Sequence, residues 1–425
     1  MSKDKMKLIP YGISDFEKIQ KKGIYYIDKT GYIPILENLG DFLFLIRPRR
    51  FGKSLLLSIL ESYYDIAKKD QFEEIFKNTA IKDNPTEERN SYLILKLDFS
   101  AVQASMDEVK DSFEHYNQGV LDVFLEKYKE YFENVFFSNI EKHETFSDKL
   151  NYLMNYSRLK GLKIYLLLDE YDNFTNTILA TEGKEMYTQL TRGEGFFRYF
   201  FSMLKAATSG SGAALSRLFI TGVSPITMDD VTSGFNIGRN ICLLDSINEL
   251  LGLRSEEVRQ IIKYYQDHGK IKEGEEDLHY NLMSDWYNNY KFSDFEGQRV
   301  FNTDMVLYYI SDLIELGRPS KSMIDENMKS DYKRFRHLIM LDNKLNGNFN
   351  ILNEISATGE VSGVINKSFP VHGLLDKDNF ISLLFYFGLL TRDRVQEGKE
   401  YFSVPNSTIR HFHSDYLNKA YAEGL

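Results

Sequence analysis

Residues 42–54 decide the fold, and they read Phe-Leu-Phe-Leu-Ile-Arg-Pro-Arg-Arg-Phe-Gly-Lys-Ser. The first five residues are apolar without interruption, which is typical of a strand buried on both faces of a parallel sheet. From Leu55 to about Ala67 apolar residues recur at helical spacing. The sequence therefore predicts a buried strand, a loop that contains Gly52, and a helix that begins directly after this loop.

The triplet Gly52-Lys53-Ser54 has the chemistry of a phosphate-binding loop. In such loops backbone N–H groups and the helix N-terminus hold phosphates, the lysine reaches the β- and γ-phosphates, and the hydroxyl binds Mg²⁺. The usual loop opens with glycine, whereas this one opens with Arg47. We predict ATP and Mg²⁺ as cofactors, with Ser54 as a metal ligand. The predicted cofactor-binding residues are Arg49, Arg50, Phe51, Gly52, Lys53 and Ser54. The two arginines could equally be surface residues or ion-pair partners.

A second buried strand, Ile164–Leu168, ends in Asp169 and Glu170. In phosphoryl-transfer enzymes an Asp at this position binds Mg²⁺, and a neighbouring Glu can take the proton of the attacking water. We therefore predict Asp169 as a metal ligand, and Glu170 and Lys53 as catalytic residues. The alternative is that Asp169 only caps a loop and that Glu170 is solvated.

Two more strands are predicted at 92–98 and 217–220, with helices at 107–132, 146–160 and 196–207 between the strands. Alternating strands and helices indicate an α/β fold with a mostly parallel sheet. A strand between the two motifs is typical of the additional-strand branch of P-loop NTPases. Thr221 follows the 217–220 strand and is predicted to sense the γ-phosphate or the water, although Thr is also ordinary at strand ends. Arg239 could be an arginine finger or a structural residue.

After about residue 245 the pattern becomes helical, at 255–268, 275–290, 303–316 and 331–344. A helix at 380–390, a hairpin around 396–399 and a last helix from Asn406 to about Lys419 look like a winged helix. We predict an α/β domain at 1–245, a helical lid at 246–345 and a winged-helix-like region at 346–425. DNA binding through Arg392, Arg394, Lys399 and Arg410 is an alternative use of the last region.

Composition limits the class of protein. Hydrophobic residues make up 43% and charged residues 27%, which is typical of a globular chain. The 52 Lys and Arg against 62 Asp and Glu give a net charge of −10, which argues against a protein dominated by nucleic-acid binding. The single cysteine, Cys242, excludes a disulfide scaffold. No apolar stretch reaches the length of a membrane span, so we expect a cytoplasmic protein without membrane contact.

Together these residues resemble the predicted bacterial AAA-ATPase-like proteins, which often carry a C-terminal nuclease-like domain of the PD-(D/E)XK type. Arg47 in place of glycine is that family's own pattern. The strings that carry the resemblance are 26–30 (Tyr-Ile-Asp-Lys-Thr), 47–54, 168–172 (Leu-Asp-Glu-Tyr-Asp), 221–226, 232–237, 286–292, 380–390 and 404–406 (Val-Pro-Asn). The resemblance implies ATP binding and hydrolysis, with the helical half as a lid. Only nine residues follow Tyr416, so we expect the nuclease-like domain to be absent.

These observations favour a Mg²⁺-dependent ATPase whose nucleotide state controls a lid and a protein effector, or a nuclease-like partner. The alternative is a nucleotide-gated switch with little hydrolysis, which could contact DNA through its C-terminal region. The family resemblance also allows an oligomer. The sequence does not identify the substrate or the biological process.

Overall fold

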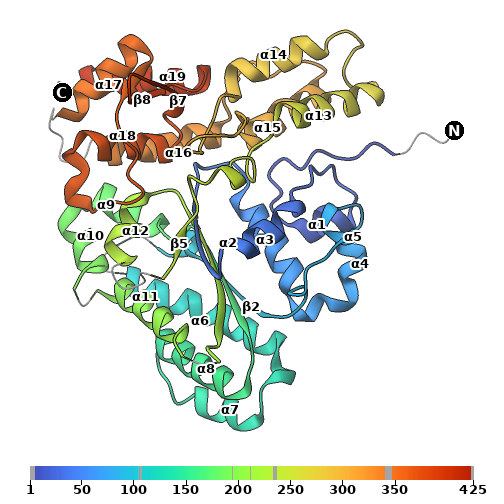
Figure 1. Ribbon diagram of the computed structural model, residues 1–425, viewed down its shortest axis with the longest axis vertical. Coiled ribbons are helices and arrows are strands. Elements are labelled where there is room, and N and C mark those ends of the chain that lie inside the picture. Colours follow the sequence, from blue (N-terminus) through green and yellow to red (C-terminus); the bar gives the residue numbers. More distant parts are fainter. Residues whose placement is uncertain are drawn as a thin grey trace.

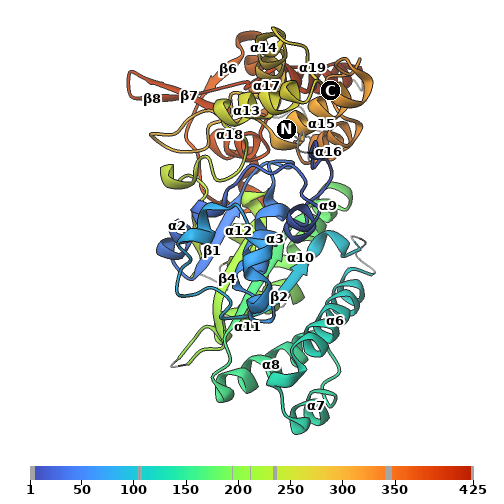
Figure 2. The ribbon, with the colours of Figure 1, turned by 90° about the vertical axis from the view of Figure 1, so that its right-hand side faces the viewer.

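The computed structural model describes residues 5–103, 105, 108–193, 195–210, 212–232, 237–339 and 347–422. Its centre is a five-stranded sheet with helices on both faces (Figure 1). In the view turned by 90°, α3 (Lys53–Tyr64) lies in front of the sheet, and α11 (Phe196–Ala207) and α12 (Pro225–Thr232) lie behind it (Figure 2). The helices of the C-terminal part lie at the end of the sheet where the phosphate-loop motif is found.

All pairings in the central sheet are parallel, and the strand order is β2-β3-β4-β1-β5. The strands are β1 (Phe42–Ile46), β2 (Leu93–Asp98), β3 (Ile164–Asp169), β4 (Leu215–Gly222) and β5 (Arg239–Asn240). This order confirms the predicted additional-strand type of α/β fold. The strand that separates the two motif strands, β1 and β3, is β4. The predicted 92–98 strand, β2, lies at the edge beyond β3.

The predicted helices of the α/β part are present. The segment 109–160 forms a helical arm that extends away from the sheet (Figure 2). Besides α3, α11 and α12, the α-helices of this part are α1 (Phe16–Lys21), α2 (Ile33–Leu39), α4 (Phe72–Ile75), α5 (Ala80–Asp83), α6 (Val109–Lys127), α7 (Asn134–Ile140), α8 (Phe146–Lys160), α9 (Asn173–Thr181) and α10 (Gly183–Thr191).

The C-terminal part is helical, as predicted, and ends in the predicted order of helix, hairpin and helix. Its elements are α13 (Ser255–Asp267), α14 (Glu276–Tyr287), α15 (Thr303–Leu316), α16 (Glu326–Ile339), α17 (Gly347–Thr358), β6 (Glu360–Ser362), α18 (Lys377–Tyr386), β7 (Thr391–Gln396), β8 (Lys399–Ser403) and α19 (Ser407–Ala422). The hairpin gains a third antiparallel strand, because β6 pairs with β8. This arrangement is the winged-helix-like region.

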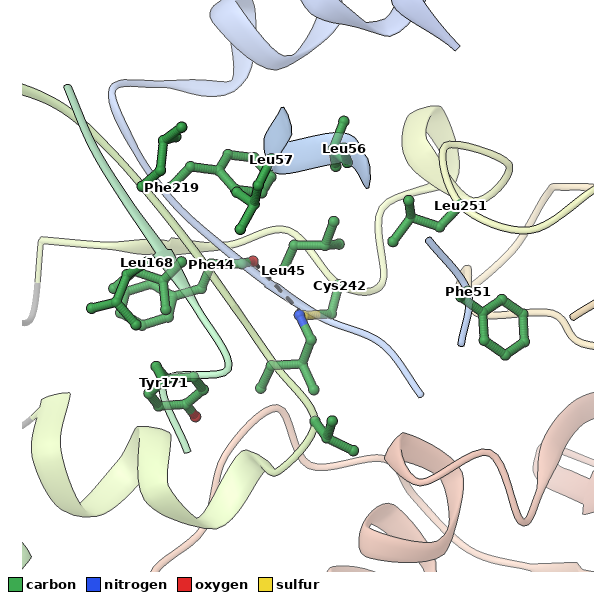
Figure 3. Packing of buried hydrophobic residues seen from close by; sticks show 14 of the residues in the cluster. Phe44, Leu45, Phe51, Leu56, Leu57, Leu168, Tyr171, Phe219, Cys242 and Leu251 are labelled. Carbon is green, nitrogen blue, oxygen red and sulfur yellow. Dashed lines mark hydrogen bonds between the residues drawn. The ribbon is translucent and has the colours of Figure 1, made fainter. Parts of the chain in front are cut away.

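The core beneath the phosphate loop is apolar and closely packed. Leu45 and Cys242 are fully buried side chains of this core (Figure 3). The Ile46 N–H donates to the Cys242 sulfur over 2.9 Å. This contact joins the end of β1 to the segment that follows β5. Burial raises the pKa of the Cys242 thiol to about 11, so the thiol packs as a small hydrophobic group. The loop therefore starts from a rigid strand end.

Among the described residues, no helix is both long enough and apolar enough to cross a membrane.

Candidate functional site

The predicted phosphate loop joins β1 to α3. Gly52 caps α3 with φ of +100°, a left-handed conformation that a residue with a Cβ rarely adopts. Lys53, the first residue of α3, is 5% exposed, and its Nζ donates to the carbonyl oxygens of Arg47 and Pro48, each over 3.0 Å. Burial lowers the pKa of Lys53. The lysine is thus folded back onto its own loop, and Ser54 follows it in the first turn of the helix.

The carboxylate edge lies across β3 and β4. Asp169 is buried, and its Oδ1 accepts from the Thr221 hydroxyl over 2.5 Å and from the Glu170 N–H over 3.0 Å. Thr221 is fully buried, so in this structure it orients the Asp169 carboxylate. Its role as a γ-phosphate sensor stays a prediction. Glu170 adopts a positive φ of 48°, and burial raises the pKa of its carboxyl.

The residues after Glu170 fix the end of β4. Asp172 is buried and accepts from the backbone N–H groups of Val223 and Ser224, while the Tyr171 hydroxyl donates to the Ser224 carbonyl over 2.8 Å. A Cβ at Gly222 would overlap the Tyr171 ring and the Asp172 carboxylate. Glycine at position 222 is therefore required by close packing against Tyr171 and Asp172, which follow β3.

A cavity of about 300 Å³ lies beside the loop. Three parts of the chain line it: the N-terminal segment 10–14, the loop from Arg50 to Leu55, and the start of α15. Glu170 also faces it. A smaller cavity of about 70 Å³ shares Gly52 and Leu55 with the first and is lined mainly by apolar and aromatic side chains, among them Tyr25 and Tyr26. The structure thus brings Lys53, Ser54 and Glu170 together around one space.

The two loop arginines bind carboxylates of the helical part. Arg49 Nη1 lies 2.8 Å from Asp331 Oδ1, and its Nη2 lies 3.5 Å from Glu170 Oε2. Arg50 Nε lies 2.8 Å from Asp331 Oδ2, and its Nη1 lies 2.8 Å from Asp304 Oδ2. The sequence left open whether these arginines bind the cofactor, lie on the surface or form ion pairs. The structure shows ion pairs. The aspartates are functional candidates that sequence reasoning missed.

Arg47 and Phe51 pack between the sheet and the helical part, and Phe51 also lines the smaller cavity. The Arg47 guanidinium is 4.3 Å from the centre of the Phe292 ring and donates to the Cys242 carbonyl over 2.5 Å. Phe51 packs edge-to-face on Tyr290 and Phe292, with ring centres 4.9 and 5.4 Å apart. Arg47 therefore has a structural role at the position where the usual loop has glycine. Phe51 packs the loop against Tyr290 and Phe292.

The string 26–30 joins the N-terminal segment to the helical part. Asp28 accepts from the backbone N–H groups of Thr30 and Ala80, over 2.8 and 2.6 Å. Lys29 Nζ lies 2.9 Å from both carboxylate oxygens of Glu257 on α13. These contacts give the string a packing role. Of the string 232–237, residues 233–236 lie outside the described residues.

The remaining basic candidates lie away from the cavity. Arg239 is exposed on β5 and donates to the Leu39 carbonyl over 2.7 Å. Arg392 is buried and paired with Asp294 and Glu400. Arg394 is paired with Glu360 and Asp393, whereas Lys399 and Arg410 are exposed. Two of the four candidate DNA contacts are thus neutralised within the chain.

Comparisons with known proteins agree with the motifs. The family described as predicted AAA-ATPase matches residues 10–232. An uncharacterized protein in the vnfD 5′ region of Azotobacter chroococcum mcd 1 is 48% identical over 59 residues, which cover 14% of this chain and 11% of that protein. The match therefore spans about a tenth of that relative's length.

Three solved structures align along most of the chain with low similarity. Cdc6p from Pyrobaculum aerophilum has a TM-score of 0.33 at 10% identity and covers 92% of this chain and 91% of its own. The Aeropyrum pernix ORC2 protein, in ADPNP and ADP complexes, has a TM-score of 0.38 at 12% identity. The alignment covers 99% of this chain and 97% of the ORC2 chain. The Aeropyrum pernix ORC1 protein in complex with DNA has a TM-score of 0.32 at 13% identity. The alignment covers 93% of this chain and 92% of the ORC1 chain.

Proposed function

The chain belongs to the predicted AAA-ATPase family, and on that premise we propose that it binds ATP with Mg²⁺ and hydrolyses it beside Lys53. One observation carries the proposal: Gly52, Lys53 and Ser54 at the start of α3 line the same cavity as Glu170, which follows β3. A helix N-terminus and a lysine on one side, with carboxylates on the other, are what a metal–triphosphate requires.

The residues fit the nucleotide and its metal. The backbone at Gly52 and the N-terminus of α3 would hold phosphate oxygens, and Lys53 would exchange its two carbonyl partners for them. Ser54 and Asp169 would hold Mg²⁺. Among the described residues, no group of three or more His, Cys, Asp or Glu could bind a metal by itself. Mg²⁺ is usually bound through one or two carboxylates together with substrate phosphates.

Each proposed catalytic group has a defined environment. Mg²⁺, when bound, neutralises charge on the phosphates. Glu170 would accept the proton of the attacking water, and its raised pKa makes it a stronger base than an exposed glutamate. Thr221 would keep the Asp169 carboxylate oriented toward the metal. Lys53 would stabilise charge on the transferred phosphoryl group.

The smaller apolar cavity supports a nucleotide over a free polyphosphate. It adjoins the phosphate cavity at Gly52 and Leu55, and Tyr25 and Tyr26 contribute aromatic surface to it. A purine base is flat and mostly apolar, and such bases bind in apolar pockets with aromatic walls. We therefore place the base in this cavity.

A second candidate is the nucleotide-gated switch with slow turnover. The observation in its favour is that Lys53 and both loop arginines already bind groups of the chain itself. In either case we propose residues 1–245 as the ATPase unit, 246–345 as the lid and 346–425 as the winged-helix-like region that meets an effector.

The test is phosphate release with Mg·ATP, together with ATP binding, in the wild type, Lys53→Ala and Glu170→Gln. Lys129→Ala is the control, because Lys129 is an exposed lysine on the helical arm. An ATPase loses turnover in both site variants and keeps ATP binding in Glu170→Gln. Binding without turnover, abolished by Lys53→Ala, identifies the switch. If the wild type binds no ATP, the proposal fails.

A further inference from the structure

The loop arginines are held by three aspartates from the helical part, which we call the carboxylate clamp: Asp304, Asp325 and Asp331. Asp331 binds both arginines, one through each carboxylate oxygen. Asp304 binds Arg50 twice, since its backbone N–H also donates to the Arg50 carbonyl over 3.1 Å. Asp325 Oδ2 lies 3.7 Å from Arg50 Nη1. These contacts join residues more than 250 positions apart in the chain.

The clamp contacts are largely withdrawn from water. The side chains of Arg49 and Arg50 are 20% and 24% exposed, and those of Asp325 and Asp331 are 8% and 13% exposed. Ion pairs at this depth are screened less than surface pairs, so each is a stronger constraint than an exposed one. Arg50 also has a left-handed φ of 70°, which a non-glycine residue keeps only when its surroundings hold it there.

One member of the clamp, Asp304, lines the cavity where we place the phosphates. Arg50 and Asp304 both line the 300 Å³ cavity, next to Lys53 and Glu170. Around the loop, six carboxylates (Asp169, Glu170, Asp172, Asp304, Asp325 and Asp331) face three cations (Arg49, Arg50 and Lys53). A triphosphate therefore meets a surplus of negative charge as long as the arginines stay on their aspartates.

We propose that the carboxylate clamp competes with nucleotide phosphates for Arg50, so that binding of the triphosphate releases Asp304 and loosens α15 and α16 from the loop. Arginine binds carboxylate and phosphate through the same planar donors, which makes the two partners alternatives. This inference rests on the proposed function, because it takes the cavity beside Lys53 as the triphosphate site.

Arg49 extends the same device to Glu170. It bridges Asp331 on α16 and the Glu170 carboxylate, and it also donates to Asn173 over 2.9 Å. While this bridge is intact, the Glu170 carboxylate faces a guanidinium instead of a water molecule. Movement of α16 would free the Arg49 guanidinium and the Glu170 carboxylate together. Asp331 is therefore a positioning residue that acts on Glu170 through Arg49.

The test measures affinity for a fluorescent non-hydrolysable ATP analogue with Mg²⁺ in the full chain, for the wild type, Asp304→Asn and Asp331→Asn. Asp277→Asn is the matched control, because it breaks an exposed ion pair with Arg259 in the same helical part. We expect about tenfold tighter binding in each clamp variant and no change in the control. Hydrogen exchange on the wild type gives a second readout, in which amides of α15 and α16 exchange faster with the analogue than without it.

The outcomes separate the two claims. If the wild type binds and Lys53→Ala does not, but the clamp variants bind equally or more weakly and exchange in α15 and α16 is unchanged, the clamp is wrong and the nucleotide site stands. If the wild type binds and each clamp variant binds about tenfold more tightly, both proposals stand. If neither the wild type nor the clamp variants bind, both proposals fail.

Discussion

Replacing Thr221 by valine tests how the carboxylate edge is held. The change keeps the branched shape and removes the hydroxyl that donates to Asp169 over 2.5 Å. Both residues are buried, and Glu170 N–H remains as the other donor to the same oxygen. A hydrogen bond to a charged group contributes about 1.5–3 kcal/mol, so we expect a loss of about 2 kcal/mol.

The lost hydrogen bond can lower the free energy of unfolding, and it can also weaken Mg²⁺ binding if Asp169 is a metal ligand. Urea unfolding without nucleotide reports the cost to the fold. If Thr221 orients Asp169 for Mg²⁺, the Mg²⁺ concentration for half-maximal ATP turnover also rises, by up to about 30-fold for 2 kcal/mol. Thr191→Val is the control, since Thr191 is also fully buried and its hydroxyl donates to the Tyr187 carbonyl one turn earlier instead of to Asp169. A Thr221→Val protein with unchanged stability and unchanged Mg²⁺ requirement would refute this reasoning.

Three further changes probe the loop and its supports. Arg47→Gly restores the usual first glycine but removes the stacking on Phe292, so we expect a loss of roughly 2 kcal/mol in urea unfolding without tighter ATP binding. Tighter binding would mean that Arg47 merely obstructs a standard loop. Gly222→Ala should lower the free energy of unfolding by about 1–3 kcal/mol, because the new methyl group overlaps Tyr171, and an unchanged urea midpoint would contradict the packing described. Because burial raises the pKa of Glu170, the Glu170 carboxyl stays protonated to higher pH in the folded state than in the unfolded state. The free energy of unfolding therefore falls as pH rises from 4.5 through the folded-state pKa. Glu170→Gln should remove that fall in urea unfolding measured across the interval, and an identical pH dependence in both proteins would show that Glu170 is not the group responsible.

The motif-bearing elements could be predicted from sequence because their signals are local. The uninterrupted apolar runs of β1 and β3 mark strands buried on both faces, and the predicted bounds of β1 agree with the structure. The helices α8 and α11 were also predicted with their observed bounds. The short strand β5 and the Thr-rich helix α9 carried no such signal, and their structure depends on packing against neighbours.

The clamp could not be predicted, because its partners are local in space and distant in sequence. Asp304 follows the helix cap Asn302 and reads as an ordinary acidic residue in the first turn of α15. Asp331 lies inside a helix rich in charged residues. Only the fold shows that both point to Arg50, and the same holds for the stacking of Arg47 on Phe292.

The order in which the cavity walls are synthesised has a consequence for translation. The loop, β3 and β4 all precede residue 223, whereas Asp304 and Asp331 follow Arg50 and Arg49 by 254 and 282 positions. At about 5–20 residues per second, a ribosome needs roughly 13–50 s to synthesise the chain from Arg50 to Asp304. A nascent chain can therefore complete its sheet while the loop arginines still lack their aspartates. Nucleotide that reaches the growing protein in this period would meet an unrestrained loop, and the restraint would arrive with the last third of the chain.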